Sequence, residues 1–291
     1  MNNTLQKSYP SLAKKLNIQN LWIKHEYLNE SGSHKIRLMK HLIDEYFKKG
    51  KNNFVISSSG NAAIAAAYYL NKYRKKNFKL MIFVSKNISA NKWQRLKSAT
   101  GKTKNIIIKK VVRPKQQAFL FGKRYKFILL RGSEKRNSPQ AYYSLARELI
   151  KIPNLRTVFV PSSSGITALG LYQTFNKLKK KIEIHIVQTE KIYSLSKDFD
   201  HDFSPKQESL ATAIVDKIAL RKKEVSEMIK KSLGSGWIIN DQSLKEAKKI
   251  YQQIDSSFKS YDSLLSLAGV IKAKQKNWPL RGTVCCLFTG L

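Results

Sequence analysis

The sequence predicts an α/β protein with a mostly parallel sheet covered by helices. From Phe54 onward, short β-branched or apolar runs alternate with stretches of helical periodicity, which is the pattern of βα units. Two of these runs end in serine and glycine turns that lead directly into helices. With 291 residues, 42% of them hydrophobic, the chain can bury the core of one large or two modest domains.

Each expected element follows from a local pattern. The expected strands are short apolar runs at 53–57, 80–84, 105–112, 126–130, 157–161, 182–187 and 283–288. Apolar residues at helical spacing predict a helix over 36–47, and Leu145 and Leu149 predict another around them. The polar stretch 192–208 is expected to be a loop.

The chain is strongly basic. Its 55 Lys and Arg residues against 19 Asp and Glu residues give a formal charge of +36, which by itself indicates an anionic partner such as nucleic acid. The lysines are spread in short clusters such as Lys179-Lys180-Lys181, without an arginine-rich tail or a base-stacking motif. A solvated basic surface is therefore the favoured interpretation, and nucleic acid stays open as a partner only because of the net charge.

Two further features limit the class of protein. No apolar run approaches the roughly 20 residues of a membrane helix, and the N-terminus lacks the apolar core of a signal peptide, so we expect a cytoplasmic protein without a membrane partner. Cys285 and Cys286 are adjacent within an apolar run. They are expected to be buried strand residues, and the sequence predicts no metal site.

The stretch SGSHKIR places one lysine directly after a flexible turn. Ser31, Gly32 and Ser33 can bend sharply, and a serine that caps the following helix would put Lys35 in its first turn. The partial positive charge of a helix N-terminus predicts a lowered pKa for this amine, which favours the neutral form that attacks carbonyl groups. An ordinary surface lysine is the alternative.

Two strand-to-helix junctions are rich in serine. ISSSGNAAIAAAYYL at 56–70 and VPSSSGITALGL at 160–171 each run from a strand through serines and a glycine into a helix, the second beginning near Thr167. Such turns direct hydroxyl and backbone N–H groups toward an anion above the carboxyl ends of the strands. In the first turn, Asn61 can also donate a hydrogen bond. The alternative is a pair of ordinary capped βα turns.

Taken together, these motifs resemble the fold type II pyridoxal-phosphate enzymes, the tryptophan synthase β-like group that includes threonine synthase and cysteine synthase. HEYLNESGSHKIR resembles the segment that carries the cofactor lysine, SSSGNAA the asparagine loop, and VPSSSGITALG the phosphate loop. VQTE, ESLATAI and the terminal LFTGL resemble later segments, the last two as threonine synthases spell them. The resemblance covers nearly the whole chain, in the order of the family.

The resemblance implies a role for each matching residue. Lys35 would hold pyridoxal 5'-phosphate as a Schiff base and act as the catalytic base. The other implied residues are Asn61 for the phenolic oxygen of the cofactor, Ser58, Ser59 and Asn61 for the substrate carboxylate, Ser163, Ser164, Gly165 and Thr167 for the cofactor phosphate, and Thr289 for the pyridine nitrogen. The phosphate loop departs from the family at Ser163 and Ile166, where glycines are common, and a β-branched residue cannot adopt the positive φ that glycine allows.

The resemblance also implies the architecture and the activity. We expect two α/β domains, each an open, mostly parallel sheet with helices on both faces, with the cofactor in the cleft between them. The small domain would span 36–125, and the large one 1–35 plus 126–291. The expected protein is a homodimeric lyase of amino-acid biosynthesis that resembles threonine synthase. Cysteine synthase-like β-replacement and threonine or serine dehydration are alternatives, as is a degenerate, non-catalytic relative whose basic surface binds a polyanion.

Overall fold

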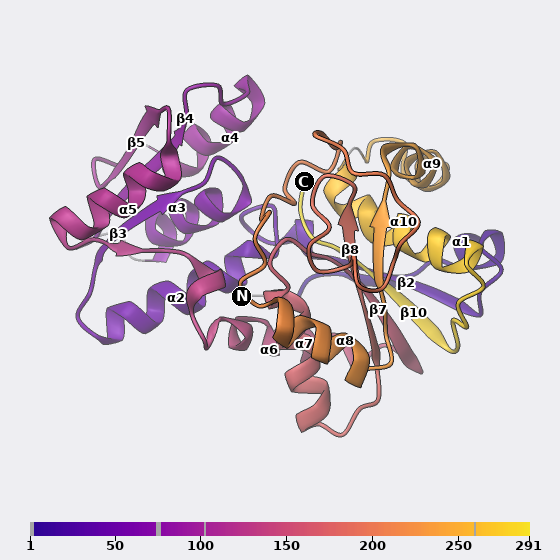
Figure 1. The fold of residues 1–291 in the computed structure, drawn as a ribbon. Coiled ribbons are helices and arrows are strands. Elements are labelled where there is room, and N and C mark those ends of the chain that lie inside the picture. Colours follow the sequence, from indigo (N-terminus) through magenta and orange to yellow (C-terminus); the bar gives the residue numbers. More distant parts are fainter. Residues whose placement is uncertain (1–2, 74–76, 102, 259) are drawn as a thin grey trace. The chain divides into compact units, whose positions relative to one another are not determined.

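The computed structural model describes residues 3–73, 77–101, 103–258 and 260–291 (Figure 1). Their contacts divide the chain into two compact units. The large unit contains Met1–Leu28 and Tyr142–Leu291, and the small unit contains Asn29–Ala141. Among the described residues, no helix is both long and apolar enough to cross a membrane.

The small unit contains a four-stranded, wholly parallel sheet with the strand order β5-β4-β3-β6. α5 packs on the sheet, and α3 packs against both α2 and α4. The elements in chain order are α2(Lys35–Lys48), β3(Asn53–Ser57), α3(Asn61–Tyr73), β4(Lys79–Ser85), α4(Ala90–Thr100), β5(Ile106–Val111), α5(Pro114–Tyr125), β6(Ile128–Leu129) and the 3-10 helix η2(Gly132–Glu134). All four strands expected in this part of the sequence are present, although β6 is shorter than expected.

The large unit contains a six-stranded sheet with the order β1-β2-β10-β7-β8-β9, parallel except for the pairing of β1 with β2. Figure 1 shows α6, α7 and α8 on one side of this sheet and α9 and α10 on the other. Its elements are β1(Gln6–Ser8), α1(Pro10–Lys15), β2(Asn20–His25), η1(Glu26–Leu28), η3(Ser138–Tyr142) at the unit boundary, α6(Tyr143–Leu149), β7(Leu155–Pro161), α7(Ile166–Lys177), β8(Glu183–Thr189), α8(Lys222–Lys231), β9(Gly236–Ile239), α9(Asp241–Gln252), α10(Tyr261–Gln275) and β10(Thr283–Phe288). The sequence predictions missed β1, β2 and β9.

The boundaries of the compact units differ from the expected division at 36 and 125. Residues 126–141 lie with the small unit because β6 pairs with β3 and because Gly132 packs against Leu38 of α2. Residues 29–34 lie there as well, since the Glu30 carboxylate is 2.9 Å from Lys72 Nζ at the end of α3. The small unit therefore extends beyond 36–125 at both ends.

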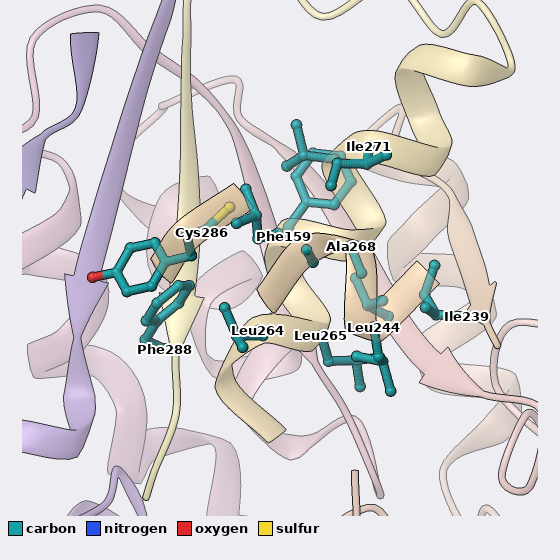
Figure 2. Close-up of a cluster of buried hydrophobic side chains, with 14 of the residues drawn as sticks. Phe159, Ile239, Leu244, Leu264, Leu265, Ala268, Ile271, Cys286 and Phe288 are labelled. Atoms are coloured by element: carbon teal, nitrogen blue, oxygen red, sulfur yellow. The ribbon is translucent and has the colours of Figure 1, made fainter. Parts of the chain in front are cut away.

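The core of the large unit is built around α10, which is buried on most of its circumference. Leu264, Leu265 and Ala268 of this helix lie in one apolar cluster with Phe159 of β7 and Phe288 of β10 (Figure 2). A helix that is apolar on all sides must be covered on all sides, and the sheet and α9 supply that cover.

The two cysteines are buried strand residues, as the sequence predicted. Cys285 and Cys286 lie side by side in β10 and are both unpaired, with Cys286 in the cluster around α10. Adjacent residues of a strand point to opposite faces of the sheet, which separates the two sulfur atoms. Burial raises the pKa of the Cys285 thiol to about 12, so this thiol stays protonated at neutral pH.

The stretch 192–208 contains no helix or strand, as expected, but it is held firmly. Gln188 Oε1 accepts hydrogen bonds from the backbone N–H groups of Leu195 and Ser196, at 2.7 and 3.0 Å. The Asp200 carboxylate accepts from Ile238 N and lies 2.7 Å from Lys272 Nζ, with only 5% of its side chain exposed. Part of the polarity of this stretch therefore comes from groups that bond within the protein.

Because two histidines are buried, we predict that the protein loses stability in mild acid. The ring of His25 lies between the hydroxyls of Tyr9 and Tyr27, at 3.0 and 3.1 Å, and burial lowers its pKa from 6.5 to about 4. Burial also lowers the pKa of His185. Between pH 6.5 and 4 the unfolded chain binds protons that the folded chain does not, so stability falls as the pH falls through this window. For His25 alone, we expect the free energy of unfolding to be about 2 kcal/mol lower at pH 5 than at pH 7.

The measurement is urea unfolding at both pH values for the wild type and for His25→Gln. Carboxylates also titrate in acid, so the informative quantity is the difference between the two proteins. The His25→Gln variant is expected to be less stable at pH 7, because the amide replaces the ring imperfectly, but less sensitive to acid. An equal loss in both proteins would show that His25 is not responsible.

Candidate active site

Lys35 is the first residue of α2, which confirms its expected place in a first helical turn. The turn before it bends at Gly32, whose φ is +75° and whose N–H donates to Asn29 O at 2.7 Å. The expectation that a serine caps the helix was wrong. The residue before the helix is His34, which has helical backbone angles and makes no side-chain capping bond. Ser33 could cap the helix only if the helix began one residue earlier, at His34.

Two buried hydroxyls precede Lys35 in this turn. Among the described residues, neither Ser31 Oγ nor Ser33 Oγ has a hydrogen-bond partner, although both atoms are inaccessible to solvent. Buried hydroxyls in native proteins are nearly always bonded, and exceptions are frequent at binding sites. The start of α2 thus combines a half-buried lysine, an uncapped helix terminus and two unsatisfied polar atoms.

The asparagine loop connects β3 to α3. Ser58 Oγ accepts a hydrogen bond from Gly60 N at 3.2 Å, which closes the turn, while Asn61 is the first residue of α3. Ser58, Ser59 and Asn61 are all half-buried. The Asn61 carbonyl oxygen accepts from the Arg95 guanidinium at 3.3 Å. The side-chain NH₂ of Asn61 is thereby oriented to donate to another acceptor.

The topology of the small unit brings Lys35 and the asparagine loop to the same edge of its sheet. α3 follows β3 directly, so it begins at the carboxyl edge, and a short connection joins the end of α2 to the amino end of β3. In the third turn of each helix, Tyr69 OH of α3 donates to Asp44 Oδ1 of α2 at 2.6 Å. Because this contact joins the third turn of one helix to the third turn of the other, the two helices begin at the same edge of the sheet.

The phosphate loop connects β7 to α7 in the large unit. Gly165 precedes the helix with a φ of +77°, and a Cβ there would lie 2.4 Å from Val225 Cγ2, so only glycine fits. No side chain caps α7, which leaves its first backbone N–H groups available to an anion. Thr167 is buried in this first turn. Neither Ser163 nor Ile166 has a positive φ, so the departures from the family glycines cause no backbone strain.

The hydroxyl of Ser163 is fully engaged within the protein. It donates to Asp216 Oδ2 at 2.9 Å and accepts from the backbone N–H groups of Val215 and Asp216, at 3.1 and 2.9 Å. A hydroxyl has one donor and two acceptor sites, so all three are used. Ser164 is half-buried beside it. In this arrangement Ser163 can offer an anion only its backbone N–H.

Thr289 lies at the same edge of the large sheet as the phosphate loop. It directly follows β10, which pairs in parallel with β7, and continuing their register from Cys286 opposite Phe159 brings Thr289 level with Ser162. The next residue is fixed, because Gly290 N donates to Ser263 Oγ at 3.1 Å at the start of α10. Thr289 is buried.

Sequence reasoning missed two residues at these loops. Arg95 and Asp216 contact the asparagine and phosphate loops, but neither belongs to a motif with a local spacing, and Arg95 is one of many cations in the chain. Among the described residues, no group of three or more His, Cys, Asp or Glu side chains is arranged to hold a metal ion. Each unit therefore presents, at the carboxyl edge of its own sheet, loops suited to an anionic or carbonyl-bearing ligand.

Comparison with known proteins identifies the family of the chain. The family model described as pyridoxal-phosphate dependent enzyme matches residues 3–290. A comparison with the sequences of curated proteins finds no match. Among solved structures, maize serine racemase is similar with a TM-score of 0.84 and 18% identity, over 99% of this chain and 88% of that one. The O-acetylserine dependent cystathionine beta-synthase of Helicobacter pylori matches with a TM-score of 0.79 and 19% identity, over 100% and 93% of the two chains.

Threonine deaminase isoform 2 of Solanum lycopersicum is also similar, with a TM-score of 0.81 and 13% identity over 99% of this chain and 79% of that one. At these identities the likeness establishes the fold, which is that of fold type II, as the sequence predicted. The match of the family model covers nearly the whole chain, including every candidate residue. The protein therefore belongs to the pyridoxal-phosphate dependent enzymes, with the fold of type II.

Proposed function

We propose that the protein catalyses elimination or replacement on a small L-amino acid, in the manner of threonine synthase. The observation that carries the proposal is the position of Lys35, which begins α2 at the same sheet edge as the asparagine loop. The proposal of a threonine synthase-like reaction is supported by the residues of three motifs, SSSGNAA, ESLATAI and the terminal T-G, which resemble those of threonine synthases. We further propose a homodimer in the cytoplasm.

Pyridoxal phosphate, when bound, withdraws electrons from the α-carbon of an amino acid. The residues of this chain would supply the rest. The Lys35 amine would hold the cofactor until the amino group of the substrate displaces it. The freed amine would then take the proton from the substrate α-carbon and later return it. Ser58, Ser59 and Asn61 would hold the substrate carboxylate, and Asn61 would also orient the phenolic oxygen of the cofactor. Backbone N–H groups of the phosphate loop and the start of α7 would bind the phosphate.

Thr289 supports elimination over transamination. A hydroxyl at the pyridine nitrogen does not keep that nitrogen protonated, whereas a carboxylate would. A threonine hydroxyl in this position would therefore favour prompt departure of a leaving group over transamination. Thr289 is buried at the end of β10, which suits a role in holding one fixed polar atom.

The main alternative keeps the chemistry and changes the substrate. Cysteine synthase-like β-replacement and dehydration of serine or threonine are favoured by the similar structures, whose names include an O-acetylserine dependent enzyme and a threonine deaminase. The pockets for the leaving group and nucleophile are built from scattered residues, so motif spelling separates these reactions poorly. The alternative of another class is a non-catalytic relative whose surface, with a net charge of +36, binds a polyanion.

The test is a spectroscopic and product screen of the purified protein with added pyridoxal phosphate. We expect a visible absorption band from the lysine-bound cofactor. We also expect this band to shift with one amino acid among serine, threonine, O-acetylserine and a phosphorylated hydroxy-amino acid. Release of phosphate would support the threonine synthase-like choice, while release of acetate or ammonia would support the alternatives. A colourless protein that binds RNA in a salt-sensitive way would overturn the enzymatic proposal.

A further inference from the structure

Ser163 forms the contact between the phosphate loop and a distant segment of the large unit. Residues 209–216, here called the strap segment, contain neither helix nor strand. The backbone N–H groups of Val215 and Asp216 both donate to Ser163 Oγ, which donates to Asp216 Oδ2 at 2.9 Å. The Asp216 side chain and backbone thus hold one hydroxyl from two sides.

The strap segment is anchored at two further points. Asp241 Oδ1, in the first turn of α9, accepts from Ser209 Oγ and from Leu210 N, both at 3.0 Å. Asp262 Oδ1, in the first turn of α10, accepts from Ala213 N at 2.8 Å. A carboxylate that accepts backbone N–H groups makes a strong, charge-assisted bond. The strap segment is therefore a fixed support from which Asp216 can position Ser163.

The phosphate loop needs such a support because its own side chains provide little. Ser162 Oγ donates only to Val160 O of the preceding strand, at 3.1 Å. Gly165 must hold a positive φ, and no side chain caps α7. An anion is bound well only when several N–H groups converge on it without reorganisation. The contact between Ser163 and Asp216 fixes the loop at its centre.

We propose that Asp216 is a positioning residue for the cofactor phosphate. It holds the Ser163 hydroxyl, which stabilises the loop and does not contact the anion. The loop then binds phosphate through its backbone N–H groups. This inference rests on the proposed function of the loop. It assigns a role to a residue outside every motif, and it limits the expected contact of Ser163 with the phosphate to the backbone N–H.

The test compares the dissociation constants of pyridoxal phosphate and of pyridoxal, which lacks the phosphate. Asp216→Ala and Ser163→Ala are each expected to raise the dissociation constant of pyridoxal phosphate about tenfold. This equals about 1.4 kcal/mol, the size of one net hydrogen bond. Pyridoxal should be bound as by the wild type. The double variant should also bind pyridoxal phosphate about tenfold more weakly, rather than a hundredfold, because both changes break the same contact. Asp216→Asn should retain near-normal binding, since its amide oxygen still accepts from Ser163.

Asp198→Ala serves as the matched control, because Asp198 pairs with Lys222 at the surface of the same unit. Thermal unfolding of each variant checks that it folds. Weakening by Ser163→Ala alone would overturn the proposal, because the hydroxyl would then contact phosphate directly. So would equal weakening by Asp216→Asn and Asp216→Ala, or no change in either variant. If the wild type binds neither ligand, the proposed function fails instead.

Discussion

Lys35→Ala is expected to abolish covalent attachment of pyridoxal phosphate. An amine is required to form a bond to the aldehyde carbon, and alanine has none. Treatment with cofactor and then borohydride should add the mass of one reduced cofactor to the wild type and none to the variant. The visible absorption band should disappear with it, and turnover of any amino acid found in the screen should fall by several orders of magnitude.

The abundance of lysine makes the control for Lys35 important. Lys48 lies at the other end of α2 and is exposed, so Lys48→Ala should keep both the added mass and the band. Lys35→Arg retains a positive charge without a nucleophilic amine, and it should fail as Lys35→Ala does. Peptide mapping of the reduced wild type should find the label at Lys35. A label at another lysine would refute the assignment.

The sequence predicted most of the apolar strands, but it did not predict β9, although its four residues are buried and uncharged. β3 and β10 were predicted with their observed bounds because they are largely buried and contain no charge. β2 was missed since Lys24 and His25 interrupt its pattern, although both are buried. Lys24 is buried because Glu148, far along the chain, pairs with it, and the ring of His25 is held by the hydroxyls of Tyr9 and Tyr27. Periodicity cannot reveal such partners.

The candidate site shows the same division. Lys35 and Asn61 lie at helix starts and Gly165 lies in a turn, as expected, because these positions follow from local patterns that the sequence itself displays. The use of the Ser163 hydroxyl was not predictable, because its partner Asp216 lies 53 positions away. Motif resemblance identified the loop but not what supports it.

Glu148→Ala is expected to destabilise the large unit by about 3–5 kcal/mol, because it leaves a buried cation without its counter-charge. Lys24 Nζ of β2 lies 2.6 Å from Glu148 Oε2 of α6, and only 1% and 9% of the two side chains are exposed. The same amine donates to Thr4 O at 2.7 Å, so it also fixes the start of the chain. One neutral carbonyl cannot replace the carboxylate. Urea unfolding followed by tryptophan fluorescence measures the loss.

The double variant Lys24→Met/Glu148→Leu shows how much the intact pair contributes to the free energy of unfolding, as distinct from the destabilisation caused by removing one partner. Removing both charges leaves neither member of this pair as an uncompensated buried charge, and apolar side chains of similar volume can fill the space. Stability should therefore return to near the wild-type level or exceed it. Asp202→Ala, which breaks the exposed pair with Lys276, should change stability little. If the double variant is as unstable as Glu148→Ala, the lost stability came from packing and not from charge. Since Lys24 and Glu148 join β2 to α6, recovery would show that apolar contacts can stabilise this connection without the charge pair.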